Sequence, residues 1–208
     1  MSMEFQKRFP IWAWWVAGII AVAALAGGII FIVRNSGPSL PPGLVEKRAE
    51  ASRLLEEASR IEDVDVKPLI TLEAKKDFAG AVALMDSALA VNSRQEQLNG
   101  ALVSVSDELA KIAVGVEPDD AGAKAVEAFS ILAQLAEAEK KFFTDRRALY
   151  EAGRDYYRAL AAKKKPSLSN ELAALVETIT SDLTKAKELH QRFSTAAKAF
   201  DEALKARK

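Results

Sequence analysis

The feature that most constrains this chain is a block of 23 residues near its N-terminus, from Ile11 to Val33, that contains no charged side chain. As an α-helix, a block of this length spans roughly 35 Å, enough to cross a hydrocarbon core about 30 Å thick. Because backbone amides in lipid must be paired within the segment, a helix is the expected conformation. The sequence therefore predicts a tail over residues 1–10 and a transmembrane helix over residues 11–33.

The residues at both ends of this block are those that favour a membrane–water interface. Trp12, Trp14 and Trp15 crowd its N-terminal end, and Arg34 follows its C-terminal end. Indole rings prefer the headgroup region, and cytoplasmic flanks carry an excess of cations. Since a Lys-Arg pair precedes the block, the N-terminus is expected in the cytoplasm and the rest of the chain outside it.

A cleaved signal peptide is the alternative interpretation of the same block. Ala24-Leu25-Ala26 resembles the small-residue site at which such peptides are cut. However, apolar residues continue from there to Val33, and the block is longer than the usual apolar region of about 7–15 residues. A single-pass signal anchor, bound to the lipid bilayer through residues 11–33, is therefore the favoured prediction.

The composition of the whole chain excludes several classes of protein. With 29 Lys and Arg against 29 Asp and Glu, the net charge is zero, which disfavours a general nucleic-acid binder. The chain has no Cys and one His, so disulfide frameworks and thiolate metal sites are excluded. No phosphate-binding loop, nucleophile motif or metal-binding helix motif is present, and the expectation is a non-enzymatic protein without a cofactor.

After a Pro/Gly/Ser linker over residues 34–43, residues 44–208 are expected to form one α-helical domain. Ala, Leu, Glu and Lys dominate, alternating β-branched runs are absent, and prolines separate the helical patterns. The predicted helices cover residues 44–62, 69–114, 120–164 and 168–207. Asn92-Ser93 lies between two apolar stripes of the second long segment, which leaves open a kink or turn there, but one unbroken helix is favoured.

Apolar residues in the two C-terminal segments repeat at heptad spacing, which is typical of helices that pack side by side. In the last segment the repeat runs through Leu172, Val176, Ile179, Leu183, Ala186, His190, Phe193, Ala197, Phe200 and Leu204. In segment 120–164, two adjacent columns with aromatic residues form a face wide enough for two neighbours. The predicted fold is all-α: a single N-terminal transmembrane helix followed by an elongated antiparallel bundle of three long helices and one short helix.

Two groups of side chains are candidates for binding. His190 lies on the apolar repeat of the last helix, where an imidazole is a pH sensor, a single metal ligand or, as the favoured interpretation, a residue at the edge of the core that is hydrogen-bonded to a neighbouring helix. The other candidates share the middle of segment 120–164 and could line a polar pocket for an anionic or amphipathic ligand: Glu139, Arg146, Tyr150, Tyr156 and Tyr157. The plainer interpretation is an ion pair that fixes helix register, with tyrosines bonded across the bundle.

These patterns predict a membrane-anchored, extracytoplasmic helical-bundle protein that acts as a scaffold or protein-interaction module. Its expected partners are the lipid bilayer and an unidentified protein or a second copy of the chain, and no nucleic acid. The alternative is a stalked sensor or ligand-binding domain that uses the tyrosine-rich region of the third bundle helix.

Overall fold

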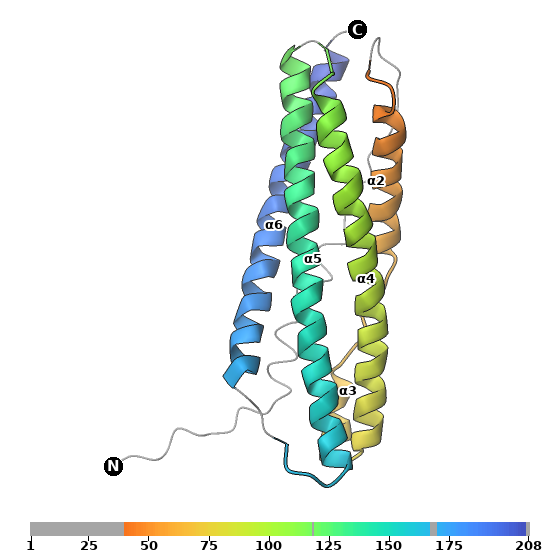
Figure 1. Ribbon diagram of the computed structural model, residues 1–208, viewed down its shortest axis with the longest axis vertical. Coiled ribbons are helices and arrows are strands. Elements are labelled where there is room, and N and C mark those ends of the chain that lie inside the picture. Colours follow the sequence, from red (N-terminus) through yellow and green to blue (C-terminus); the bar gives the residue numbers. More distant parts are fainter. Residues whose placement is uncertain (1–39, 118, 167–169, 207–208) are drawn as a thin grey trace, which may run out of the picture.

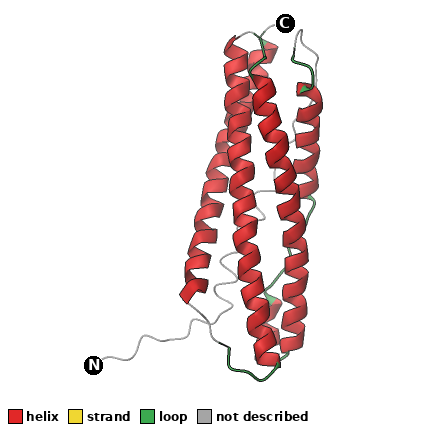
Figure 2. Ribbon diagram, in the orientation of Figure 1, coloured by secondary structure: helices red, strands yellow, loops and turns green. Residues whose placement is uncertain are grey.

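Five helices make up the described part of the protein in the computed structural model, which describes residues 40–117, 119–166 and 170–206 (Figure 1). They are α2 (Leu44–Ser59), α3 (Pro68–Ala74), α4 (Phe78–Ala113), α5 (Asp119–Ala161) and α6 (Asn170–Lys205). Loops connect these helices, and the described residues contain no strand (Figure 2). The all-α bundle predicted from the sequence is confirmed.

The helices form an elongated bundle in which successive passes run in opposite directions (Figure 1). Central α5 packs against both α4 and α6, as its two apolar columns predicted. Helices α2 and α3 follow one another along α4 and together make a broken first pass of a four-helix bundle. We call one end the Leu40 end, because the first described residue, the α4–α5 turn and the end of α6 lie there. The opposite end, with Lys76 and Lys163, is the lysine end.

Helix α4 is continuous because one heptad seam runs through its whole length. All its buried positions except Val105, which is buried beside the seam, alternate by four and three residues: Ala81, Met85, Ala88, Asn92, Gln95, Asn99, Leu102, Ser106, Leu109 and Ala113. The apolar stripes in the sequence look out of phase because polar residues occupy the seam positions between them. Asn92 therefore lies buried inside a continuous helix, and the turn left open at Asn92-Ser93 does not occur.

The prediction of one helix over residues 69–114 is wrong, because a break separates α3 from α4 at Lys75–Asp77. Lys76 adopts a left-handed backbone conformation with φ 57°, which ends α3. The Asp77 carboxylate then accepts a hydrogen bond from the Gly80 amide at 2.9 Å and caps the start of α4. The bundle consequently has two short helices instead of one, while the other predicted helix limits agree within three residues.

The core consists of two apolar clusters. One, at the Leu40 end, is contributed by α2, α4, α5 and α6 and includes an edge-on contact of Phe129 with Phe200, whose ring centroids are 5.8 Å apart. The other, at the lysine end, combines Val66 and Leu69 with side chains of α4, α5 and α6. Between them lies a layer of polar side chains, buried except for the partly exposed Asp63, which we call the polar waist: Asp63, Asn92, Gln95, Asn99 and Arg146.

The predicted membrane segment over residues 11–33, with Trp12, Trp14, Trp15 and Arg34, lies outside the described residues. Within the ranges that are described, none of the five helices has the length and apolar character needed to cross a bilayer. Of the predicted linker over residues 34–43, only its last four residues are described. There, Leu40 packs against the cluster at its own end of the bundle.

Candidate functional site: the polar waist

The polar waist is centred on Arg146 of α5, whose side chain is only 4% exposed. Its Nε donates to Asn92 Oδ1 at 2.6 Å, and its Nη2 donates to Gln95 Oε1; both acceptors come from α4. The two terminal nitrogens also meet the Asp63 carboxylate, with Nη1–Oδ2 at 3.3 Å and Nη2–Oδ1 at 3.2 Å. The guanidinium is therefore held by a forked ion pair and two amide oxygens, the arrangement its planar shape favours.

The acceptors around Arg146 are themselves fixed by further hydrogen bonds. Gln95 Nε2 donates to Asp63 Oδ1 at 3.1 Å, and Asn92 Nδ2 donates to the Phe143 carbonyl at 2.8 Å. Asn99 Nδ2 donates to the Gln95 carbonyl at 3.1 Å. Each buried amide thus has a defined orientation, which lowers the free-energy penalty of placing polar groups in the core.

Aromatic rings surround the same guanidinium. Arg146 Cζ lies 5.2 Å from the ring centroid of Phe142, 4.8 Å from that of Phe143 and 5.7 Å from that of Tyr150. Such cation–π contacts are strongest where water is excluded. With rings around it and acceptors along its edge, the guanidinium has its bonding capacity met by the protein itself.

The break between α2 and α3 brings Asp63 into this layer. Helix α2 ends at Ser59, and the extended residues that follow run along α4 until Pro68 begins α3. Asp65 Oδ1 accepts a hydrogen bond from the Lys67 amide at 3.0 Å, which shapes the turn into α3. The Asp63 side chain remains 21% exposed, so the ion pair has one buried and one partly solvated member.

This arrangement suits a structural role better than catalysis. Asp63 is the only carboxylate that the described residues place on Arg146, and it is occupied by the ion pair. An anionic ligand would have to displace Asp63 before it could reach the guanidinium. Among the described residues no group of three or more acidic or histidine side chains is placed to hold a metal ion.

Of the predicted site residues, the structure brings only Tyr150 to Arg146. Burial raises the pKa of the Tyr150 hydroxyl, with the Asp63 charge adding to the shift and the Arg146 charge opposing it. Glu139 is half-buried on α5, and among the described residues neither a hydrogen bond nor an ion pair joins it to Arg146. Burial alone raises the pKa of Glu139 to about 7.

The other two tyrosines lie closer to the lysine end and form a separate pair. Their ring centroids are 5.3 Å apart in an edge-on contact. Tyr157 is completely buried, and its hydroxyl oxygen has no hydrogen-bond partner in the structure. Burial raises the pKa of Tyr157, and the nearby Glu73 and Tyr156 raise it further. The described residues therefore do not form a pocket shared by Arg146 and all three tyrosines.

The predicted place of His190 on the α6 seam needs correction. Leu189 is the buried residue at this level, and His190 is half-buried beside it. Beyond this level the predicted repeat resumes, because Phe193, Ala197 and Phe200 are buried as expected, with Ala196 buried beside them. Near the end of the helix Ala203, instead of Leu204, is the buried residue.

Sequence reasoning missed Asp63, Gln95 and Asn99, and it considered Asn92 only as the site of an optional kink or turn within a helix that was favoured to be unbroken. A usable signal was present: Asn92, Gln95 and Asn99 are spaced by three and four residues, in register with the apolar seam on both sides. Polar residues at seam positions predict buried partners on a facing helix. No local pattern marks Asp63, because its role depends on where the loop lies against α4.

Comparison with known proteins adds no family assignment. No protein-family model matches the chain, and no curated protein and no solved structure shows significant similarity to it. The functional interpretation therefore depends on the sequence and on the bundle itself.

Proposed function

We propose that this chain is a single-pass membrane protein whose helical bundle serves as an extracytoplasmic scaffold, making its contacts through the ends of the bundle. The observation that carries the proposal is an uninterrupted rod. Helix α5 alone has 43 residues, which at about 1.5 Å per residue span roughly 65 Å. A rod of this length holds its far end at a fixed distance from its attachment.

The Leu40 end is the proposed attachment side. The apolar block over residues 11–33 lies a few residues before Leu40, so a membrane helix there would tether this end of the bundle. Two of the three large apolar side chains that are exposed in the described residues belong to this end: Val45, 44% exposed, and Val114, 75% exposed. Apolar groups facing a headgroup layer or a membrane partner fit that position.

A scaffold is better supported than the alternative of a stalked ligand sensor. The sensor needs a free polar site, but Arg146 already has Asp63, Asn92 and Gln95 as partners. The flanks of the rod carry charged pairs such as Lys141 with Asp182, whose Nζ and Oδ2 atoms are 2.6 Å apart. Polar flanks leave the ends as the surfaces for protein partners or for a second copy of the chain.

Site-specific labelling tests the anchor and its orientation, because the chain has no native Cys. Single-cysteine variants Lys164→Cys and Ser2→Cys are expressed in cells and treated with a membrane-impermeant maleimide. We expect Lys164→Cys to react in intact cells and Ser2→Cys to react only after permeabilisation. The opposite pattern contradicts the orientation, and release of the chain from membranes by alkaline carbonate contradicts the anchor.

Photocrosslinking tests whether the ends make the contacts. A photocrosslinking amino acid is placed at Val114, at Lys164 or, as a control on the flank, at the exposed position Glu137. We expect discrete higher-mass adducts from one or both end positions and none from the flank. Adducts that form only at Glu137, or at no position, count against a scaffold that works through its ends.

A further inference from the structure

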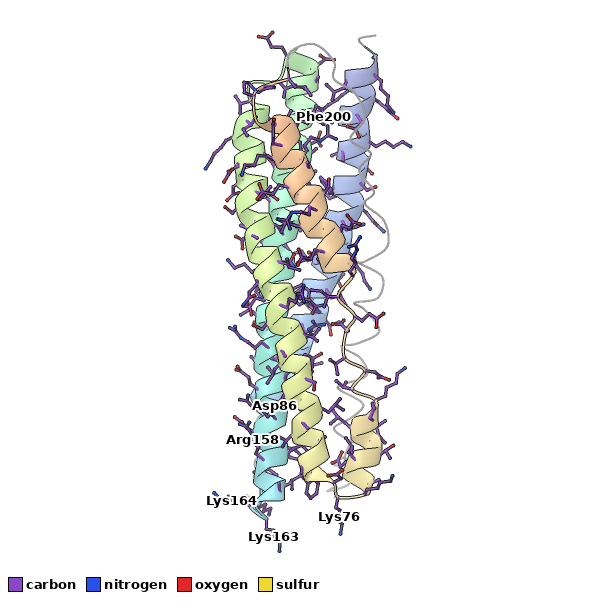
Figure 3. All side chains as sticks on the ribbon, turned by 90° about the vertical axis from the view of Figure 1, so that its right-hand side faces the viewer. Lys76, Asp86, Arg158, Lys163, Lys164 and Phe200 are labelled. Carbon is purple, nitrogen blue, oxygen red and sulfur yellow. The ribbon has the colours of Figure 1, made fainter. Side chains whose placement is uncertain are left out.

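The lysine end carries a cluster of cations that the proposed anchor and the polar waist do not use. Lys75 and Lys76 lie in the α3–α4 turn, and Lys163, Lys164 and Lys165 follow α5. All five side chains are exposed, and none forms an ion pair with another described residue. Figure 3 shows Lys76, Lys163 and Lys164 together at one end of the bundle.

The two turns at this end share one backbone arrangement. In the first, the Lys76 amide donates to the Glu73 carbonyl at 3.0 Å and the Asp77 amide to the Leu72 carbonyl at 2.8 Å. In the second, the Lys163 amide donates to the Leu160 carbonyl and the Lys164 amide to the Ala159 carbonyl, both at 2.9 Å. Both pairs of bonds define a Schellman helix ending.

Each of these endings places a lysine where glycine is the usual residue. Lys76 has φ 57° and Lys163 has φ 55°, and they are the only non-glycine residues with positive φ in the described chain. A left-handed backbone is unfavourable for a residue with a Cβ atom, whereas glycine adopts it freely. Interaction with the helix dipole does not require a lysine at the left-handed position. Lys75 and Lys164 lie next to these positions and already place a positive charge at each helix end. Both turns therefore have a charged lysine at a position where glycine would avoid the backbone strain.

We propose that the lysine end binds a linear polymer of closely spaced phosphate groups. Lysine ammonium groups bind phosphate as point charges and need no fixed geometry, unlike the arginine fork, which suits one oriented ligand. The flexible, exposed side chains provide no pocket, which fits a repeating charge instead of one small ligand. The cluster contains no aromatic residue on which bases could stack, and this disfavours single-stranded nucleic acid.

The distance from the proposed anchor distinguishes this partner from the anchoring bilayer. Leu40 lies at the other end of the bundle, about 65 Å from the lysines along α5. This step rests on the proposed function, since it takes the Leu40 end as the tethered one. The lysines then cannot contact lipid headgroups of the same membrane, whereas they can contact a polymer that lies beyond the membrane surface.

The test measures binding of inorganic polyphosphate to the full chain in zwitterionic detergent micelles. We expect wild-type binding to weaken by at least about tenfold between 50 and 200 mM NaCl. The double variant Lys76→Gly/Lys163→Gly should bind several-fold more weakly and yet melt about 2–4 °C higher per site, because glycine relieves the left-handed strain. The variant Lys76→Arg/Lys163→Arg should retain binding.

A matched control removes two exposed lysines from elsewhere on the rod. Lys111→Gln/Lys198→Gln makes the same change in net charge toward the Leu40 end and should leave polyphosphate binding unchanged. Equal loss in this control and in the glycine variant would overturn the proposal, as would a lower melting temperature of the glycine variant.

Two further ligands identify the partner: tighter binding to vesicles of 30% phosphatidylglycerol, or to oligothymidylate of equal charge, would assign the lysine end to lipid or nucleic acid instead. Because binding is measured in micelles, its loss is distinguishable from failure of the membrane anchor in carbonate extraction.

Discussion

At the scale of single residues, Arg146 is the side chain on which the middle of the bundle depends most. Replacement by methionine keeps much of its volume but leaves Asn92, Gln95 and Asp63 without their common donor. Buried acceptors that lose a partner are destabilising, so Arg146→Met is expected to lower the free energy of unfolding by about 3 kcal/mol. Denaturant unfolding followed by circular dichroism measures the change.

A compensating variant separates loss of the charge from loss of packing. In Arg146→Met/Asn92→Leu/Gln95→Leu the acceptors on α4 are removed together with the donor, so no buried amide is left unsatisfied there. This triple variant is expected to recover at least half of the stability lost in the single variant. A further decrease in the free energy of unfolding would mean that the polar waist stabilises the fold by more than the hydrogen bonds among its own residues.

Glu139 should give the bundle a pH-dependent stability. Burial raises the pKa of Glu139 from its ordinary value of 4.5 to about 7 in the folded protein, so the folded state binds this proton more tightly than the unfolded state. Stability from this group is complete below pH 4.5 and is lost as the pH rises to about 7. Melting temperatures across that range should therefore fall less steeply in Glu139→Gln than in the wild type.

The control for this pH effect is Glu137→Gln, a change at an exposed position two residues away on the same helix. It removes one carboxylate without altering the buried side of α5, and the pH dependence of the melting temperature should match that of the wild type. If both variants flatten the profile equally, the effect belongs to overall charge and not to the burial of Glu139.

At the scale of elements, two glycines in neighbouring helices should respond in opposite ways to alanine. A Cβ atom at Gly100 of α4 meets no atom within 4 Å, whereas one at Gly122 of α5 would lie 2.5 Å from the backbone oxygen of Val116. Gly100→Ala should stabilise the protein by about 0.5–1 kcal/mol through helix propensity. Gly122→Ala should destabilise it by about 1–3 kcal/mol, because the carbonyl must move.

Thermal unfolding of the two glycine variants beside the wild type provides the measurement. The comparison is internal, since both substitutions add the same methyl group to a helix. A gain at both positions would mean that the turn before α5 can relax around the new Cβ, and that the close approach of Val116 imposes no constraint.

The helices themselves were largely predictable from the sequence, because apolar periodicity decides helix type over long segments. The α3–α4 break was not predictable in the same way. The left-handed position there is occupied by Lys76 and not by the glycine that usually marks it, and Asp77 alone is a weak indication of a helix start. The continuity of α4 was predicted in spite of its polar seam residues. Their pairing with Arg146 and Asp63 follows only from the alignment of three separate segments, namely α4, α5 and the α2–α3 connection, and no local pattern contains that alignment.

At the scale of the whole molecule, the polar waist divides the core into two apolar clusters that share α4, α5 and α6. We expect each cluster to open partly on its own when it is weakened, since local unfolding follows contiguous packing units. Met85→Ala at the lysine end and Leu109→Ala at the Leu40 end both truncate completely buried side chains. Each should cost about 2–5 kcal/mol of stability.

Native-state hydrogen exchange locates these losses. Met85→Ala should lower amide protection first in α3 and in residues 78–91, and Leu109→Ala first in residues 98–113. Uniform loss of protection along α4 in both variants would contradict two separable clusters and would show that the rod opens as one unit.

The even number of passes has a practical consequence for anyone who builds on this protein. The start of α2 and the end of α6 lie at the same end of the rod, so a fluorescent reporter fused after the C-terminus would sit beside the proposed tether and leave the far tip uncovered (Figure 1). A reporter meant for that tip can be inserted in the α3–α4 turn or in the connection that follows α5. Energy transfer between reporters at these two positions would then read the length of the rod directly.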